Sequence, residues 1–438
     1  MPVDTNNPIP FSEPAWLSGL PSPYYNDSHR KWHEVCHAFC SEHFYPNALE
    51  WEDKEDVPLD VYQTFAKAGF LPAKLPAPLP VEEFKRIGIT HLPGGLKIED
   101  YDVFHGAILS DNLLRTGLQG PAGAITTGIA FGTPPIINFG SRELKDRLLA
   151  DLMYGRKRIC IAITEPNAGS DVANIETTAE KTPDGKFYIV NGAKKWITNG
   201  IFSDYATMAV RTGGPGAKGI SLLVVPLTDT PGVTRRRIHV MGLKASGTTY
   251  IDLDNVKVPA SNLIGKENNG MKYIMTNFNH ERIGMCFGAV RQSRVALGAA
   301  VEYAMSRTAF NKTLMDQPVV RARLANAGVK LETLWAYVEQ LCYQMKVLPK
   351  EVADVELGGK TAMAKAYAGQ VFTECATTAL LIFGGNGLTR TGKGELIEKL
   401  YRDTPGIRIP GGSEDVLMDL AIRQLVKIYQ MKAKMAKL

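Results

Sequence analysis

The feature that most constrains the fold is the spacing of apolar residues, which changes twice along the chain. Apolar residues recur every three or four positions from residue 29 to about 156, alternate in short runs over 158–265, and return to the wider spacing from 271 onward. A period near 3.6 predicts helices and a period of two predicts strands. We therefore predict a mostly helical α+β chain with an irregular N-terminal arm, an N-terminal helical domain, a central antiparallel β-domain and a C-terminal helical bundle (1–28, 29–157, 158–268 and 269–438).

Individual runs sharpen this division. Residues 120–140 are small and apolar, which predicts a buried helix followed by a turn. The Gly-rich run GGPGAKG (213–219) lies between two β-like runs and lacks the Lys-Ser/Thr ending of a phosphate loop, so we predict a hairpin turn there. In the last segment, one helix carries an apolar stripe at helical spacing, formed by Leu324, Ala327, Leu331, Leu334, Val338 and Leu341.

Composition excludes several classes of protein. Hydrophobic residues make up 45% of the 438 residues and charged residues 22%, which is ordinary for a globular protein. No apolar run is long enough to span a membrane. The net charge of +5 suits an acidic ligand such as a nucleotide, but the chain has no dense Lys/Arg block, so we expect no nucleic-acid partner. Six dispersed cysteines indicate a reducing compartment.

The two ends of the chain bear on its cellular address. Three acidic residues precede the first basic residue, Arg30, which argues against an Arg-rich mitochondrial transit peptide. Residues 436–438 read Ala-Lys-Leu and resemble the Ser-Lys-Leu peroxisomal signal, although they also end a Lys-rich tail. We expect a peroxisomal protein, and otherwise a cytoplasmic one.

One cysteine- and histidine-rich run, HEVCHAFCSEH (33–43), contains ligand types that suit zinc. Trp32, Val35 and Phe39 form an adjoining apolar stripe, so its cysteines border a hydrophobic core. One helix rarely closes a four-ligand site by itself. We predict no metal at this run.

Two runs in the β-like region carry residues that suit a flat, charged cofactor. ITEPNAGSD (163–171) follows a strand, and its small residues expose backbone N–H groups beside Ser170, an arrangement that can bind a pyrophosphate. A plain β-turn explains its glycine equally well. In GAKKWITNG (192–200), Trp196 and Thr198 would share one side of a strand and suit the edge of a heterocycle. The alternative is a core tryptophan beside a satisfied threonine.

With the motifs that follow, the chain resembles the acyl-CoA dehydrogenase flavoproteins. The resemblance covers about 150–425 in order, through ITEPNAGSD, GAKKWITN, MGLKASGTTYIDLDNVKVPASNLIG, HERIG, YAMSRTAF, FGGNG, EKLYRD and IPGGS. It implies a C-terminal four-helix bundle, FAD as cofactor, an acyl-CoA thioester as substrate, and a homodimer or homotetramer. The implied reaction is α,β-dehydrogenation, in which a carboxylate removes the α-proton and the β-hydrogen leaves as a hydride to flavin N5. The thioester oxygen must then be held by hydrogen bonds, and the base needs a raised pKa.

The resemblance also assigns residues. The resemblance implies that FAD contacts these residues of the β-domain: Ile163, Thr164, Gly169, Ser170, Trp196 and Thr198. It adds two FAD-binding residues from the bundle, Ser413 and Asp415. It also implies that the FAD of a neighbouring subunit contacts Arg307, Phe310, Gly384 and Gly385. Near the CoA substrate it places Ser170, Ser246, Asn279, Arg282 and Gly412. Three departures weaken the contacts between subunits, namely Asn311, Pro318 and Leu381.

The IPGGS segment differs from many family members at the catalytic base. Those members carry a glutamate where this chain has Gly411. The isovaleryl- and long-chain-type members keep the base on a helix, at the position that matches Glu281. The resemblance therefore implies that Glu281 is the base and that Gly411 offers its N–H to the thioester oxygen. The rival acids, Glu414 and Asp415, resemble ordinary residues at a helix start.

Alternatives remain open for both the base and the activity. Family members with the loop glutamate often have Glu-Arg at the place of Glu281 as well, where the glutamate can be structural. The electron acceptor is an electron-transfer flavoprotein or, for an acyl-CoA oxidase, O2. Two family flavoproteins without dehydrogenase activity, a DNA-binding type and a nitroalkane-oxidising type, are the other candidates, together with a tailoring enzyme for an unusual acyl thioester.

Overall fold

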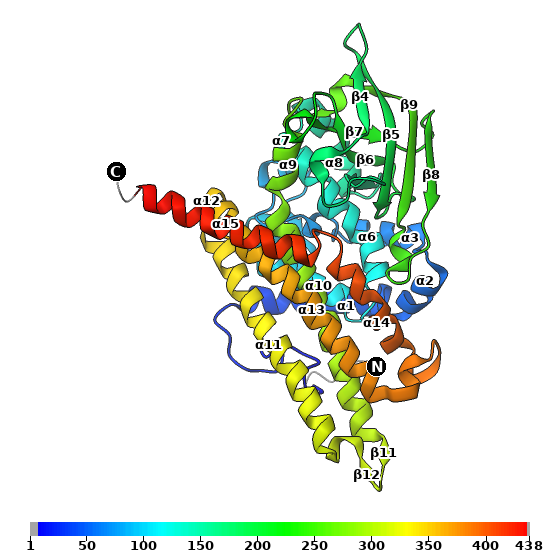
Figure 1. Cartoon of the computed structure of the whole chain (residues 1–438), viewed down its shortest axis with the longest axis vertical. Coiled ribbons are helices and arrows are strands. Elements are labelled where there is room, and N and C mark those ends of the chain that lie inside the picture. Colours follow the sequence, from blue (N-terminus) through cyan, green and yellow to red (C-terminus); the bar gives the residue numbers. More distant parts are fainter. Residues whose placement is uncertain (1–7, 436–438) are drawn as a thin grey trace. The chain divides into compact units, whose positions relative to one another are not determined.

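The computed structural model describes residues 8–435 and divides the chain into two compact units (Figure 1). The first unit contains the residues up to His37, Val103–Gln119, and the residues from Asn279 onward. The second contains Ala38–Asp102 and Gly120–Phe278. Over 8–435, no helix is long and apolar enough to cross a membrane. The address-like tripeptide 436–438 lies outside the described residues.

Long helices build the first unit, and α13 packs against α11, α14 and α15 (Figure 1). The stripe predicted for α11 is confirmed, since all six of its residues are buried. The helices with most of their residues in this unit are α1 (Asp27–His43), α5 (Val103–Leu113), α10 (Phe278–Ser306), α11 (Pro318–Val347), α12 (Lys350–Glu356), α13 (Gly358–Phe383), α14 (Glu395–Arg408) and α15 (Glu414–Met435). A short hairpin, β11 (Thr308–Ala309) with β12 (Lys312–Thr313), follows α10.

The second unit combines shorter helices with the main sheet. The small, apolar run 120–140 forms the predicted buried helix, α6, but a second short helix, α7, follows it where a turn was expected. The helices are α2 (Ala48–Lys54), α3 (Leu59–Lys67), α4 (Val81–Arg86), α6 (Gln119–Gly132), α7 (Pro134–Phe139), α8 (Arg142–Met153) and α9 (Gly270–Thr276). A two-stranded ladder, β1 (His91–Leu92) with β2 (Leu96–Lys97), lies between α4 and α5 in sequence.

The main sheet has eight strands in the order β10-β7-β6-β4-β5-β9-β8, with β3 paired to β6. It is mainly antiparallel, as predicted, but β3 and β4 each pair with β6 in parallel. The run 213–219 connects the antiparallel strands β6 and β7, which confirms the predicted hairpin turn. The strands are β3 (Ile159–Ala162), β4 (Thr178–Lys181), β5 (Phe187–Ile197), β6 (Tyr205–Arg211), β7 (Ile220–Pro226), β8 (Val233–Arg237), β9 (Thr249–Pro259) and β10 (Leu263–Ile264).

The cysteines of the run 33–43 lie in a core. Cys36 and Cys40 on α1 are each 0% exposed, and both thiols are free. This agrees with the prediction from the apolar stripe beside them. Free cysteine behaves as a small apolar residue in such surroundings.

Candidate active site

The predicted site residues are divided between the two units, and each set is described within its own unit. Those in the sheet-containing unit are Ile163, Thr164, Gly169, Ser170, Trp196, Thr198 and Ser246. Those in the helical unit are Asn279, Glu281, Arg282, Arg307, Phe310, Gly384, Gly385, Gly411, Gly412, Ser413 and Asp415.

A buried ion pair closes the loop that follows β3. Lys194 on β5 is 0% exposed, and its Nζ donates to Glu165 Oε1 at 2.7 Å and to the carbonyl oxygen of Ile163 at 3.0 Å. The Glu165 carboxylate also accepts from the backbone N–H groups of Glu176 and Thr177. Both ends of the segment 163–177 are therefore fixed to one carboxylate and one ammonium group. Neither residue was singled out from the sequence.

Both members of this pair are charged near neutral pH. Burial alone would raise the pKa of Glu165, but the Lys194 ammonium and the hydrogen bonds from the loop hold it below the usual carboxyl range. Burial lowers the pKa of Lys194 to about 8, against the opposing attraction of Glu165. A buried pair of this kind stabilises a single conformation, because removing one partner leaves an uncompensated charge.

The outer part of the same loop is open. A Cβ added to Gly169 would meet no atom within 4 Å, and Ser170 is exposed. Ile163 and Thr164 at the base of the loop are half-buried. A small-residue loop with exposed backbone on a rigid base fits the phosphate end of a dinucleotide.

Trp196 is presented by an irregularity at the end of β5. Its φ is 65°, which is rare for a bulky residue, and its side chain is 52% exposed. The pairing of β5 with β9 shifts register between Lys194 and Ile197. The strand then ends at Ile197, so the regular alternation expected through Thr198 is wrong, because Thr198 lies in the turn that follows. An exposed indole beside a half-buried threonine fits the face of a flat ring system.

Asn199 holds this turn in place. It adopts a φ of 64°, and its side chain accepts from Gly128 N–H and donates to the carbonyls of Gly123 and Ser246. Asparagine tolerates the left-handed region, and the Asn-Gly pair in the sequence was a turn signal that could have identified it. Ser246 itself is buried, and its hydroxyl donates to the carbonyl of Leu243. The predicted contact of Ser246 with CoA stays a prediction.

In the helical unit, Gly411 and Gly412 connect α14 to α15. Their φ angles are +66° and +94°, which L side chains rarely adopt. A Cβ added to Gly411 would lie 2.6 Å from Sδ of Met285 on α10. Met285 lies four residues after Glu281, so both side chains leave the same face of that helix. The sequence singled out Glu281 and Gly411, but it gave no sign of Met285.

Glu281 is half-buried in the first turn of α10. Burial lowers the pKa of the neighbouring Arg282, and the charge of Glu281 opposes that shift. Arg282 is 3% exposed and donates to the carbonyl of Gly358, and Asn279 donates to the carbonyl of Asp354. The predicted CoA contacts of Asn279 and Arg282 stay predictions.

The rival acid Glu414 is engaged by an arginine. Both of its carboxylate oxygens accept from the guanidinium of Arg408, at 2.8 Å for the bond from Nε. This hydrogen bonding holds the pKa of Glu414 below its usual range. Asp415 is exposed at the start of α15, and Ser413 beside it is half-buried.

Lys365 on α13 is a further residue at the glycine pair that the sequence did not reveal. It is 1% exposed, and its Nζ donates to the carbonyls of Arg408 at 3.1 Å and Gly412 at 2.6 Å. Burial lowers the pKa of Lys365 to about 8. The ammonium group therefore joins the end of α14 to the loop that precedes α15.

The residues predicted to reach a neighbouring subunit are accessible within this unit. Phe310 at the tip of the β11–β12 hairpin is 91% exposed, and Arg307 directly precedes the hairpin. A Cβ on Gly384 or Gly385 would meet no atom within 4 Å. Their contacts with another subunit stay predictions.

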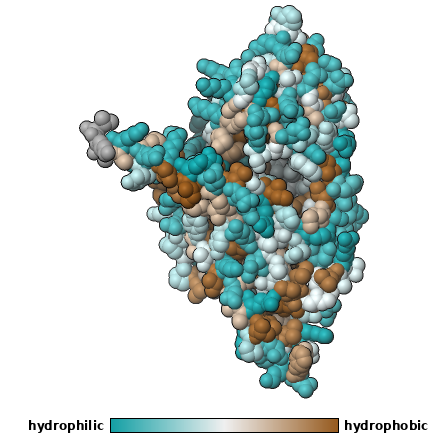
Figure 2. Space-filling model, in the orientation of Figure 1, coloured by the Kyte–Doolittle hydropathy of each residue, from teal (hydrophilic) through white to brown (hydrophobic). Residues whose placement is uncertain are grey.

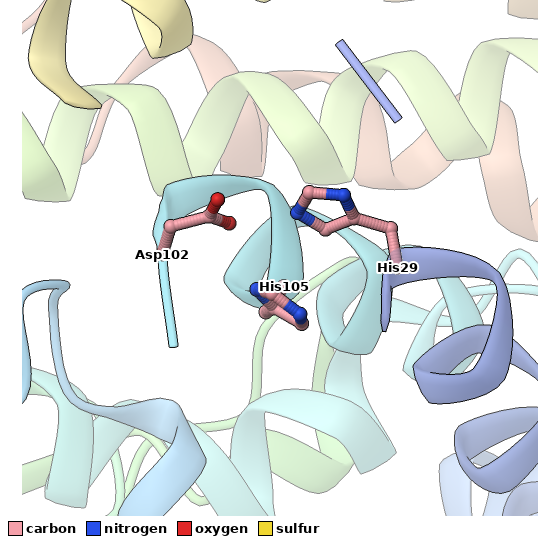
Figure 3. A group of neighbouring side chains, drawn as sticks. All are labelled: His29, Asp102 and His105. Carbon is pink, nitrogen blue, oxygen red and sulfur yellow. The ribbon is translucent and has the colours of Figure 1, made fainter. Parts of the chain in front are cut away.

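A separate group of possible metal ligands is explained by packing. The side chains of His29, Asp102 and His105 bring one ligand atom each within 4.8 Å of the others (Figure 3). The two imidazoles are 0% and 2% exposed, and their ring centroids lie 4.2 Å apart. His29 Nδ1 accepts from Asn26 N–H, and His105 Nε2 lies 3.1 Å from Ser28 Oγ. We assign the two histidines to the contact between α1 and α5, where Trp32 Nε1 also donates to the carbonyl of His105.

Comparison with known proteins covers nearly the whole chain. Models of the acyl-CoA dehydrogenase N-terminal, middle and C-terminal domains match residues 26–156, 160–256 and 268–426. The chain is 61% identical over 426 residues to acyl-CoA dehydrogenase apdG of Emericella nidulans, covering 97% of each chain. It is 37% identical to acyl-CoA dehydrogenase AFT10-1 of Alternaria alternata, covering 95% of each. A crystal structure of a probable acyl-CoA dehydrogenase from Mycobacterium abscessus matches with a TM-score of 0.81 and 30% identity, over 92% of this chain and 100% of that one.

Proposed function

Because the chain belongs to the acyl-CoA dehydrogenase family, we propose that it oxidises an acyl-CoA thioester to the 2-enoyl-CoA with Glu281 as the base. Members of this family are FAD flavoproteins, and FAD is the cofactor of this enzyme. The observation that carries the choice of base is the missing side chain at Gly411, with a residue from the Glu281 face of α10 directly beside it.

The distance from Gly411 to Met285 supports this choice. Residues four apart on a helix lie one above the other on the same face. A Cβ atom built on Gly411 would lie 2.6 Å from Met285 Sδ. The helical face that carries Glu281 is therefore the face turned toward the glycine pair, within one compact unit.

The state of the other acids supports the same choice. A base that removes a weakly acidic α-proton works best with a raised pKa. The pKa of Glu414 is lowered by its hydrogen bonds to Arg408, which must break before the carboxylate could act. Asp415 is exposed at the start of α15 and does not lie on the helix face turned toward Gly411 that carries Glu281 and Met285.

The chemistry then divides among a few groups. FAD, when bound, accepts the β-hydrogen as a hydride. Glu281 takes the α-proton onto its carboxylate. Gly411 donates its backbone N–H to the thioester oxygen, where negative charge develops, and such donors commonly contribute about 10²- to 10³-fold in rate. Trp196 and the loop at Ser170 would hold the ring and the pyrophosphate of the cofactor.

The enzyme is also proposed to be a homodimer or homotetramer. Apolar side chains gather on α15, at Met418, Ile422, Val426 and Tyr429, which share one face and are between 40% and 73% exposed (Figure 2). Phe310 projects from its hairpin in the same unit. Exposed apolar surface of this kind is typical of contacts between subunits. Sedimentation or light scattering of the FAD-loaded protein measures the state, and a monomer would contradict the proposal.

The test of the base is an anaerobic titration of FAD-loaded protein with short, branched and long acyl-CoAs, followed by loss of the oxidised flavin absorbance. Wild type is expected to bleach with at least one acyl-CoA, and that acyl-CoA names the substrate class. Glu281→Gln is expected to lower the rate by about 10²- to 10⁴-fold, the range for loss of a general base. Glu414→Gln serves as the matched control and should bleach far faster than Glu281→Gln, since its amide oxygen can still accept from Arg408.

The outcomes separate the alternatives. If Glu281→Gln bleaches as fast as wild type, Glu281 is structural and another acid is the base. If wild type bleaches with no thioester, the dehydrogenase proposal is wrong, and nitroalkane oxidation and DNA binding are tested next. The acceptor is then decided by mixing reduced enzyme with O2 or with an electron-transfer flavoprotein and comparing the rates of flavin reoxidation.

A further inference from the structure

Lys365 is a buried cation beside Gly411 and Gly412. The proposed reaction assigns no role to its ammonium group. It lies on α13, far in sequence from the loop, and is 1% exposed. Its Cε lies 3.9 Å from the place of a Cβ on Gly411. Burying an ammonium group is costly unless it is fully hydrogen-bonded, so a lysine at such a place has a specific set of partners.

Those partners are two backbone carbonyls at opposite ends of one short segment. Nζ donates at 3.1 Å to the carbonyl of Arg408, the last residue of α14, and at 2.6 Å to the carbonyl of Gly412. Carbonyls at the end of a helix lack intrahelical partners and carry partial negative charge, which a cation stabilises. The single ammonium group thus fixes the two ends of the segment that contains Gly411.

The segment that ends at these two carbonyls contains Gly411 and Gly412, whose backbone is permissive. Both glycines lie at positive φ, where glycine is readily accommodated and other residues are strained. The ion pair of Arg408 with Glu414 also joins the two ends of this segment, but it is nearer the surface, with the two side chains 38% and 19% exposed. Lys365 is the buried one of the two connections.

We propose that Lys365 is a positioning residue, which sets the amides of Gly411 and Gly412 in the direction required to hold the thioester oxygen. The inference rests on the proposed function, because it assigns to the loop an oxygen that only a thioester substrate supplies. Lys365 acts through the backbone and does not itself touch the substrate. Donors aimed before the reaction stabilise developing charge without reorganisation, and a displacement of about 1 Å can cost about 10²-fold in rate.

The test separates the acidity of the α-proton from substrate binding and from cofactor binding. Lys365→Met removes Nζ and keeps the length and apolar stem of the side chain. Lys360→Met on the same helix is the matched control, since Lys360 is a half-buried lysine of α13 and the bonds from α13 to the loop come from Lys365. A 3-thia-acyl-CoA, which has sulfur in place of the β-carbon, can lose its α-proton to the base but has no β-hydrogen to transfer. The resulting enolate next to oxidised flavin gives a long-wavelength charge-transfer band.

Lys365→Met is expected to bind the analogue and FAD within about threefold of wild type, but to reduce the band strongly and to slow flavin reduction about 10²-fold, as a misplaced donor would. Lys365→Arg, which keeps a cation and donors, is expected to restore part of the band. Lys360→Met should behave as wild type. Normal binding with a reduced band would show that Lys365→Met impairs stabilisation of the enolate and leaves substrate and cofactor binding intact.

Other outcomes overturn the inference. If Lys365→Met forms the full band and is reduced at the wild-type rate, the loop does not need Lys365. If the band, FAD content and analogue binding all fall together, Lys365 is merely structural. Should Lys365→Met fail to fold, Lys365→Gln, which keeps a shorter neutral donor, is judged by the same three measurements. A wild type that neither bleaches nor forms the band overturns the proposed function as well, and so the two failures are distinguishable.

Discussion

Replacing Gly411 with alanine tests the geometry on which the choice of base depends. Two separate costs are expected. At a φ of +66°, an L side chain loses about 1–2 kcal/mol relative to glycine. The new Cβ would also lie 2.6 Å from Met285 Sδ, so Met285 must move. Because methionine is flexible, this second cost falls at the low end of the range for overpacking, about 1 kcal/mol.

The sum is about 2–3 kcal/mol, and a melting temperature shifts by about 2–4 °C per kcal/mol for a unit of this size. Gly411→Ala should therefore lower the melting temperature by at least about 4 °C. Gly392 is the matched control, because its φ is +71° and a Cβ there would meet nothing within 4 Å. Gly392→Ala should show only the first cost.

A double-mutant cycle isolates the contact. Removing the Met285 side chain leaves room for the new methyl group, so Gly411→Ala should cost about 1 kcal/mol less in a Met285→Ala background. The assay is thermal and urea unfolding of the FAD-loaded protein, with flavin fluorescence and circular dichroism as probes. If Gly411→Ala costs no more than Gly392→Ala, and Met285→Ala leaves that cost unchanged, Met285 does not lie against Gly411 and the main support for Glu281 is lost.

Three further substitutions test two site residues and one half-buried histidine outside the site. Lys194→Met should leave the buried Glu165 charge uncompensated, lower stability by about 3–5 kcal/mol and reduce FAD content, and adding Glu165→Gln should restore part of the stability. Asn199→Ala should lower stability by about 2–4 kcal/mol, and Asn199→Gly by less, because glycine still tolerates the left-handed φ; equal losses in melting temperature would show that the φ contributes nothing. Burial lowers the pKa of His33 to about 4, and its Nδ1 accepts from Asn112. The unfolded state then binds the extra proton, so stability is lost as pH falls from about 6.5 to 4, by about 3 kcal/mol, and urea titrations should show a flatter pH dependence for His33→Gln.

The layout of the fold was predictable because it depends on local periodicity. The stripe from Leu324 to Leu341 is buried along α11, and the run 213–219 is a hairpin turn. These features are set by side chains within one element, which a sequence displays directly. The parallel pairing of β3 with β6 was not predictable in the same way, because it joins segments more than 40 residues apart (Ile159 with Tyr205).

The site was predictable only where a motif or a missing side chain marks it. Gly411 stood out because a carboxylate is absent there, and Ser170 because small residues surround it. Lys194 and Lys365 did not stand out, because a lysine in a sequence is most often a solvated surface residue. Their burial comes from partners 29 and 47 residues away, Glu165 and Gly412. The left-handed φ of Trp196 could not be predicted from the sequence either, because tryptophan has no intrinsic preference for that region.

The glycine at position 411 and the face of α10 that carries Glu281 are sterically linked. A side chain at 411 would need the space that Met285 Sδ already approaches, so Met285 would have to move before a loop carboxylate could lie beside this face of α10. With glycine there, the helix face that carries Glu281 can lie close to the loop while the backbone N–H remains available to an oxygen. Glycines at 411 and 412 provide no side chain to anchor the loop, so bonds to its carbonyls help to fix its direction. The two buried hydrogen bonds of Lys365 are of this kind, and under the proposed function the base on α10 and the buried lysine would serve one loop.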